Sequence, residues 1–130
     1  MHRRAFVGLA AGVLAALVAR VQAFGVAATN LTWRETPRLV DFANRNRLPS
    51  AFGAKEAVEA GGLISYGPDV WATAAQCIVY VDRILRGAHP AQLPVELPSK
   101  QELAINLRTA RALGISVPQS VLLRADRVIE

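Results

Sequence analysis

From residue 24 onward, short apolar runs alternate with stretches in which apolar positions recur at helical spacing. Three apolar runs, at residues 24–28, 50–53 and 63–66, predict short buried strands. Helical stretches separate these runs, and the links between successive segments are short. Because this order of strand and helix is typical of βαβ units, we expect an α/β fold built on a parallel sheet.

Local signals place the ends of the first two helices. Thr36-Pro37 has the form of an N-cap followed by a first helical position, where the missing N–H of proline costs nothing. Leu48-Pro49 then stops that helix. A second helix at residues 54–60 ends at Gly61-Gly62, a pair typical of a left-handed cap, and its charged residues indicate a solvated face. Gly67-Pro68 predicts a turn after the third strand.

The longest helix is expected at residues 70–86, with Asp69 as its N-cap and Gly87 at its end. Its apolar positions form a stripe that we expect to pack against the core: Trp71, Ala74, Ala75, Ile78, Val81 and Leu85. Cys77 is the only cysteine, which excludes a disulfide within the chain. Since its neighbours are apolar, we expect it to be a small buried residue rather than a reactive thiol.

The last third of the chain supports two interpretations at one point. Residues 89–98 contain three prolines and predict an extended connection. Ser99 and Glu102 could form the capping box of a helix, whereas the alternation of apolar residues from Leu103 to Leu107 indicates a strand. We favour a strand to Leu107, followed by helices at 109–113 and 118–125 and an extended end at 127–129.

The first 23 residues have the organisation of an export signal. Arg3 and Arg4 precede an uninterrupted apolar run at residues 5–19, and Val21-Gln22-Ala23 offers small residues for cleavage before Phe24. That run makes about 22 Å of helix, which is short of the roughly 30 Å of a hydrocarbon core. We therefore expect a signal at 1–23, exported by the Sec or the twin-arginine route, and a mature periplasmic domain at 24–130.

Charge and composition exclude several function classes. The formal net charge is +5, but three of the fifteen basic residues and none of the ten acidic ones lie within the expected signal. The remainder has no basic cluster suited to a nucleic-acid backbone. The sequence also lacks clustered metal ligands, a phosphate loop and a nucleophilic serine motif. We therefore expect no enzyme activity, no metal, no cofactor and no nucleic-acid partner.

Ligands of parallel α/β sheets bind beyond the carboxyl ends of the strands. In this sequence those ends are Thr29-Asn30, Phe52-Gly53 and residues 65–69. Tyr66 could offer a stacking face and a hydroxyl to a small ligand, or it could pack against the following helix. Trp33 could also be either a ligand platform or a packing residue, whereas Trp71 is expected in the core.

Five segments carry motifs that are specific in combination. They are VEAGGLISYGP at residues 58–68, YVDRILRGA at 80–88, LPVELP at 93–98, ELAINLRTARALG at 102–114 and LRADRVIE at 123–130. With these motifs, the chain from residue 26 to 130 resembles the C-terminal part of the periplasmic substrate-binding proteins of ABC uptake transporters. The resemblance is to the group related to tryptophan- and tyrosine-binding components.

The resemblance implies a type I periplasmic-binding-protein fold, in which two α/β lobes close on a ligand between them. Family members are longer, so this chain is expected to join a signal to a truncated C-terminal lobe. The residues that would then face the ligand cleft are Thr29, Asn30, Phe52, Ser65 and Tyr66.

The function implied by the resemblance is capture of a small solute for an ABC permease, with an aromatic amino acid among the candidate solutes. Half a cleft neither excludes water nor fixes a ligand, so impaired capture is expected. Exposed lobe surface and a bare sheet edge would favour self-association. The alternative function is that of a small secreted domain that binds a protein through the exposed lobe face.

Overall fold

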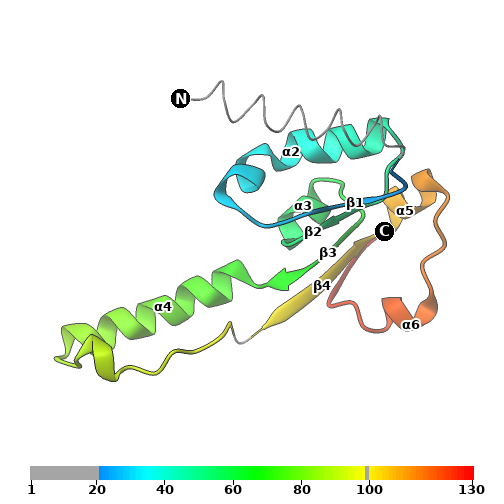
Figure 1. Cartoon of the computed structure of the whole chain (residues 1–130). Helices are drawn as coiled ribbons and strands as arrows, with labels where there is room; N and C mark the ends of the chain where they lie inside the picture. The colour runs from blue at the N-terminus through cyan, green and yellow to red at the C-terminus, as the bar shows by residue number, and fades with distance from the viewer. Residues whose placement is uncertain (1–20, 99) are drawn as a thin grey trace, which may run out of the picture.

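The computed structural model describes residues 21–98 and 100–130 and shows a mixed α/β sheet with helices around it (Figure 1). Five strands lie side by side in chain order: β1 (Phe24–Val26), β2 (Ser50–Phe52), β3 (Ile64–Pro68), β4 (Gln101–Asn106) and β5 (Arg127–Ile129). The helical segments are α2 (Asn30–Arg45), α3 (Lys55–Glu59), α4 (Val70–Leu85), η1 (Pro90–Gln92), α5 (Leu107–Leu113) and α6 (Gln119–Leu122). The expected α/β class is confirmed. The expected signal lies almost wholly outside the described residues.

The sheet is parallel at three of its four pairings, namely β1–β2, β2–β3 and β4–β5. The exception is β4, which runs antiparallel to β3, so the expectation of a parallel sheet is wrong at this pair. Pro68 and Gln101 are register partners, because the chain leaves β3 and enters β4 at the same end of the sheet. Gly67-Pro68, expected as a turn, instead forms the last paired residues of β3.

Several expected elements are confirmed with small changes in their ends. The first three strands, the helix after β2 and the terminal extended piece all form where the pattern predicts them. Gly61 adopts a positive φ of 109°, as expected of a left-handed cap. At residues 99–107 the strand interpretation is correct and the capping box does not form, since Gln101 to Asn106 belong to β4. The last helix, α6, is shorter than expected.

The start of α2 differs from the expectation, since the helix begins at Asn30 and contains Pro37. Thr29 is the N-cap: its hydroxyl oxygen accepts from the Thr32 N–H at 3.2 Å, and the Thr32 hydroxyl oxygen accepts from the Thr29 N–H at 2.8 Å. The hydroxyl of Thr36 donates to the Thr32 carbonyl oxygen, so Thr36 is an interior residue. Pro37 costs the helix about 3 kcal/mol. Burial of the apolar face of α2, which stabilises the fold by about 1.5–3 kcal/mol per large side chain, outweighs that cost.

The core lies between the sheet and the two helices α2 and α3, which cover one face of β1 to β3 in Figure 1. Leu39 and Val40 of α2 meet Phe52 of β2 and Ala57 of α3 in one buried cluster. Along β2 the burial alternates, because successive strand residues project from opposite faces. The helix-covered face of the sheet therefore supplies Phe52 to the core.

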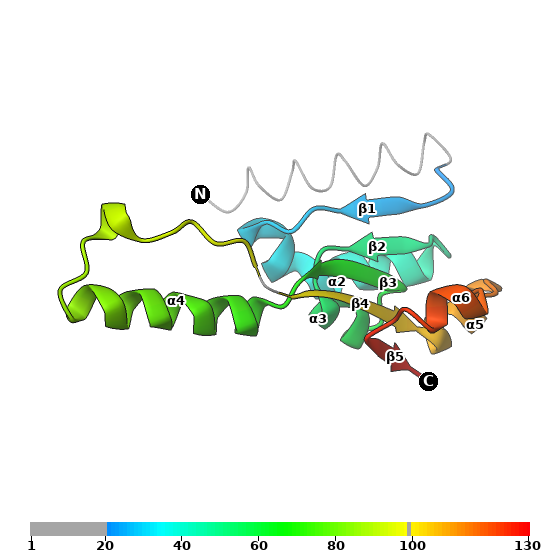
Figure 2. The ribbon, with the colours of Figure 1, turned by 90° about the horizontal axis from the view of Figure 1, so that it is seen from below.

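The helix α4 does not pack against the sheet. Asp69 caps it as expected, with one carboxylate oxygen accepting from the N–H groups of Trp71 and Ala72. No residue of α4 is buried, however, and Trp71 is 75% exposed. The expected inner stripe and the expected burial of Cys77 and Trp71 are therefore wrong. Residues 69–98, here called the arm, project away from the sheet in Figures 1 and 2.

The physical reason for this error lies in what periodicity measures. A helical repeat of apolar residues predicts that one side of a helix will be covered, and it carries no information on which surface covers it. Here β3 and β4 lead the chain out past the edge of the α2 and α3 layer (Figure 2). The amphipathic helix forms as predicted, and its apolar side has no cover within the described part of the chain.

Candidate functional site

A partly enclosed cavity of about 280 Å³ opens at the carboxyl ends of β1 and β2. Its walls come from the residues that follow these strands, from the first half of α2 and from α3. The fold brings these segments together because β1 leads into α2 and β2 leads into α3, so both helices start at the same end of the sheet. This is the end at which parallel α/β sheets bind ligands.

The cavity lining combines an aromatic face with one carboxylate. Trp33 is 45% exposed, while Phe52 is buried in the wall. Glu56, in the first turn of α3, is the only charged residue among the described residues that line the cavity. The rest of the lining is apolar apart from two threonines, Thr32 and Thr36. Such a surface suits a small solute that has a flat apolar part and a cationic group.

Pro37 interrupts the hydrogen-bond ladder of α2 beside the cavity. Pro37 has no N–H, so the carbonyl oxygen of Trp33 lacks its helical donor. The two threonine hydroxyls are already engaged, because Thr32 donates to the Ala27 carbonyl oxygen at 2.7 Å and Thr36 donates to the Thr32 carbonyl oxygen at 2.9 Å. Trp33 and Pro37 both line the cavity. The cavity lining therefore provides an aromatic face and a carboxylate.

The residues expected in the cleft are only partly brought together. Phe52 lines the cavity. Thr29 and Asn30 lie at the start of α2, where both are exposed, and the Thr29 hydroxyl serves as the helix cap. Neither of them belongs to the cavity lining. A ligand-binding role for these three residues stays a prediction.

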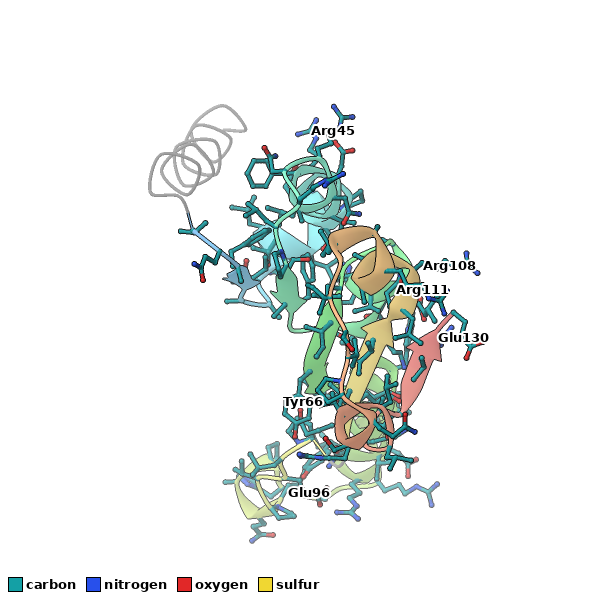
Figure 3. The ribbon with its side chains drawn as sticks, turned by 90° about the vertical axis from the view of Figure 1, so that its right-hand side faces the viewer. Arg45, Tyr66, Glu96, Arg108, Arg111 and Glu130 are labelled. Atoms are coloured by element: carbon teal, nitrogen blue, oxygen red, sulfur yellow. The ribbon has the colours of Figure 1, made fainter. Side chains whose placement is uncertain are left out.

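Ser65 and Tyr66 project from opposite faces of β3. Phe52 and Ser65 are register partners, so Phe52 and Tyr66 lie at the same end of neighbouring strands. Ser65 is buried, and its hydroxyl has no hydrogen-bond partner among the described residues. Tyr66 is 65% exposed and lies toward the arm end of β3 in Figure 3. Ligand binding by these two residues also stays a prediction.

Sequence reasoning missed Pro37 and Glu56 and left Trp33 undecided. The helix start expected at Thr36 separated Trp33 from Pro37, although residues four apart share one side of a helix. The usable signal was the Thr29 and Thr32 pair, which forms the capping box and moves the helix start upstream. Glu56 was assigned to a solvated face, and no local pattern distinguishes it from the exposed Glu59.

Comparison with known proteins identifies the family. The family described as "ABC transporter substrate binding protein" matches residues 10–129. The chain belongs to this family. No curated protein matches the sequence.

Solved structures of ABC substrate-binding proteins share the fold of the chain. The ABC domain from Streptococcus pneumonia, solved in complex with L-Trp, is 32% identical with a TM-score of 0.79, over 87% of this chain and 39% of that one. A conserved domain protein from Vibrio cholerae is 29% identical with a TM-score of 0.79, over 84% of this chain and 37% of that one. The open, ligand-free substrate-binding protein CD0873 from Clostridium difficile, at 22% identity and a TM-score of 0.61, supports the fold alone. The chain thus spans less than two fifths of the length of these structures.

An ion cluster lies next to the cavity, at the base of the arm. The Lys55 ammonium group is 2.6 Å from a carboxylate oxygen of Glu102 and 3.4 Å from one of Asp69. The other carboxylate oxygen of Glu102 is 2.8 Å from the Lys100 ammonium group. Lys55 is the first residue of α3, Asp69 caps α4 and Glu102 lies on β4. The cluster therefore ties the cavity wall to the point where the arm leaves the sheet.

Hydrogen bonds within the cluster shift the pKa of each member. The hydrogen bonds from Lys100 and from Lys55 hold the pKa of Glu102 below its usual range. The hydrogen bond from the Ala72 N–H, assisted by Lys55, does the same for the pKa of Asp69. The hydrogen bond to Glu102 is the main cause that raises the pKa of both Lys55 and Lys100. All four groups are therefore held in their charged forms.

These shifts predict a stability plateau around neutral pH. The two carboxyl groups have lower pKa values in the folded state, so their contribution is present above about pH 4 and is lost as the pH falls through the folded values. The two ammonium groups have raised pKa values, so their contribution is present below about pH 10.4 and is lost as the pH rises through the folded values. Thermal melts followed by circular dichroism from pH 2 to 11 measure this profile.

The variant Glu102→Gln tests the cause of the plateau. It should lower the melting temperature at pH 7, and this loss should shrink as the pH falls and the Glu102 carboxylate of the unmodified chain takes up its proton. The control is Asp41→Asn, which removes an exposed pair with Arg45 and should change little at any pH. Identical pH profiles for Glu102→Gln and the unmodified chain would contradict the attribution of the stability plateau to the ion cluster.

The described residues show no further site chemistry. Three or more potential metal ligands do not cluster anywhere in residues 21–98 and 100–130. His89 is exposed, and its Nδ1 accepts from the Ala91 N–H at 3.3 Å. In the same part of the chain, every helix is too short or too polar to cross a lipid bilayer.

Proposed function

We propose that the chain is an extracytoplasmic solute-binding component of an ABC importer and holds a small solute in the cavity at the ends of β1 and β2. The observation that carries this proposal is the position of Trp33 and Phe52 in one cavity at the ligand-binding end of the sheet. Family membership supports the transport role, and the partner that would receive the solute is an ABC permease.

The chemistry of the cavity favours an aromatic amino acid. The exposed face of Trp33 can stack on an aromatic ring, at centroid distances of about 4.5–7 Å. Glu56 can accept hydrogen bonds from an ammonium group. The similar domain from Streptococcus pneumonia was solved with L-Trp, which supports this choice of solute class.

Capture by this chain alone should be weak. The cavity is only partly enclosed, and its volume of about 280 Å³ lies below the roughly 300–1,000 Å³ of typical ligand pockets. In the two-lobed architecture implied for the family, a second lobe would cover the remaining ligand surface. A ligand that keeps one side in water gains less from burial, so we expect a Kd of about 1 mM.

Calorimetric or NMR titration with L-tryptophan, L-tyrosine and L-phenylalanine tests the proposal. Trp33→Ala should weaken binding about tenfold, since it removes the stacking face. The matched control is Trp71→Ala, which removes the more exposed tryptophan of the arm and should leave the Kd unchanged. A low-micromolar Kd would contradict weak capture, and equal effects of the two substitutions would contradict the cavity as the site.

The proposed export of the protein from the cytoplasm rests on the first 23 residues and on the position of β1. Cleavage after Ala23 would leave Phe24 as the first residue, which is also the first residue of β1. The mature chain would thus begin directly with a paired strand, and no part of the sheet would be lost. N-terminal sequencing of the exported protein should give Phe24, and recovery of the uncleaved chain from the cytoplasm would contradict export.

The exposed arm favours a second candidate function, that of a secreted domain that binds a protein. The observation behind it is the uncovered apolar side of α4. The titrations above separate the two functions, because a pure interaction domain would bind none of the three amino acids.

A further inference from the structure

A second hollow lies between the end of α2 and the start of α5, at the opposite end of the sheet from the solute cavity. Its volume is about 430 Å³. The end of α2 leads into the start of β2. Because β4 runs antiparallel to β3, it carries the chain to this same end, where the Asn106 N–H donates to the Leu63 carbonyl oxygen at 2.9 Å. The direction of β4 therefore brings α5 beside the end of α2.

The lining of this second hollow, here called the arginine hollow, includes two positively charged residues and no acidic one within the described part of the chain. The residues are Asn44, Arg47, Arg108, Thr109, Ala112 and Leu113. The Thr109 hydroxyl donates to the Gly61 carbonyl oxygen at 2.8 Å, and the Asn44 amide nitrogen donates to the same oxygen at 3.2 Å. The two uncharged polar side chains are thus held against the turn that follows α3. The arginine hollow therefore combines a braced wall with an excess of positive charge.

Both arginines of the hollow keep donors that no other described residue uses. The Arg47 guanidinium has neither a hydrogen bond nor an ion pair with residues 21–98 and 100–130. The Nε atom of Arg108 donates to the backbone oxygen of Glu130, and no described group accepts from its two terminal nitrogens. Arg111 lies next to Arg108 in Figure 3, as expected of residues three apart on one helix. Three arginines thus raise the positive potential at this end of the molecule.

The backbone of Arg47 is strained. Its φ is 52°, in the left-handed region, and among the described residues other than glycine it alone has a positive φ. Arg47 follows Asn46, the C-cap of α2, at a position where helices most often carry glycine. At the ends of α3, α4 and α5 the left-handed residue is indeed glycine: Gly61, Gly87 and Gly114. An arginine kept in this conformation indicates that its side chain has a role that glycine cannot fill.

We propose that the arginine hollow binds a small phosphate dianion, either inorganic phosphate or a phosphate monoester. Guanidinium groups stay charged at physiological pH, and their planar sets of N–H donors match the oxygens of phosphate. A phosphate monoester carries a charge of about −1.5 to −2 at neutral pH, which two arginines balance, whereas a carboxylate needs only one. This inference goes beyond the proposed function and does not depend on it, because the solute cavity lies at the other end of the sheet.

NMR titration of the isotope-labelled full chain with inorganic phosphate, at constant ionic strength, tests the site. Amide signals at the end of α2 and the start of α5 should shift with a Kd on the order of 1 mM. Chloride at the same ionic strength should not shift them, and equal shifts with chloride would overturn the proposal. Glycerol 3-phosphate is titrated in parallel. Tighter binding than that of inorganic phosphate would identify an ester as the ligand, and equal or weaker binding would identify free phosphate.

The variant Arg47→Gly separates a binding role from a structural one. Glycine adopts a positive φ without strain, so the melting temperature should rise by a few degrees, while loss of the guanidinium should raise the Kd for phosphate about tenfold. The matched control is Arg45→Gln, which removes an exposed arginine of the same helix that does not line the hollow. It should change the Kd by less than about twofold. Equal changes in Kd from the two variants, or a lower melting temperature for Arg47→Gly, would overturn the proposal.

A membrane surface is the competing source of phosphate groups, and vesicles of phosphatidylglycerol test it. The unmodified chain and Arg47→Gly should pellet with these vesicles to the same extent, since the proposal assigns Arg47 to a small soluble ligand. Stronger pelleting of the unmodified chain that inorganic phosphate fails to reverse would overturn the proposal in favour of a lipid surface. Titration of Arg47→Gly with L-tryptophan should give an unchanged Kd, so the failure of one site does not affect the test of the other.

Discussion

Gly67→Ala should lower the free energy of unfolding by about 3 kcal/mol, at the upper end of the usual cost of overpacking. A Cβ at residue 67 would lie 2.0 Å from the carbonyl oxygen of Gly53 and 2.8 Å from its carbonyl carbon. Both contacts are with backbone atoms, which cannot rotate away as a side chain can. β2 and β3 would have to separate at their carboxyl ends. Urea unfolding followed by circular dichroism measures the change.

The matched control for this substitution is Gly25→Ala. Gly25 also lies in a strand, and a Cβ built there meets nothing within 4 Å. Alanine restricts the unfolded chain more than glycine does, so this variant should be neutral or more stable by a few tenths of a kcal/mol. Equal losses at the two positions would show that glycine is needed in these strands for a reason other than close approach. Since Gly53 also lines the cavity, Gly67→Ala should weaken solute binding as well.

Asn106→Leu should cost about 2–4 kcal/mol, because one buried amide joins three elements. The Asn106 side-chain oxygen accepts from the Thr109 N–H at 3.1 Å and so caps α5. Its amide nitrogen donates to the carbonyl oxygen of Val58, at the end of α3, at 3.1 Å. Leucine fills a similar volume but leaves both backbone groups without a partner in a buried setting. The measurement is again the free energy of unfolding in urea.

Asn46→Ala provides the comparison for this asparagine. The Asn46 amide nitrogen donates to the Phe42 carbonyl oxygen at 2.8 Å, which is one hydrogen bond to a helix end, as at Asn106. Asn46 is exposed, so water can replace the lost partner, and we expect a loss below about 1 kcal/mol. If the two asparagines gave similar losses, burial of the Asn106 network would not be the source of its effect.

Local sequence signals were sufficient for most of the sheet. The apolar runs at β1, β2 and β3 and the alternation along β4 identify strands because each strand covers at least part of one face. The direction of β4 could not be predicted in the same way. Alternation specifies which residues share a face, and it is the same for a parallel and an antiparallel neighbour. The direction follows from the path of the arm, which joins β3 to β4 at one end of the sheet.

The sequence predicted a site at the end of the sheet where the cavity lies, and of the five residues it named only Phe52 lines that cavity. Phe52 was found because it ends a strand, and strand ends follow directly from the apolar pattern. Trp33 and Pro37 depend on where α2 begins, and two threonines competed for the N-cap position. Thr29 is the cap because Thr32 reciprocates its hydrogen bond, whereas the hydroxyl of Thr36 bonds back to the helix. Which threonine caps the helix therefore depends on hydrogen bonds between residues, and the residue type at one position does not reveal them.

The pairing of Pro68 with Gln101 has a consequence for the connectivity of the fold. The Asp69 N–H donates to the Lys100 carbonyl oxygen at 3.1 Å. This hydrogen bond extends the pairing of β3 and β4 by one step, to the point where the arm begins. In topological terms, β3 and β4 form a hairpin, and the arm is the long connection between its two strands. A two-residue turn could close this hairpin without rethreading any strand. The pairing of β3 with β4, and with it the strand order of the sheet, therefore does not depend on the path of the arm.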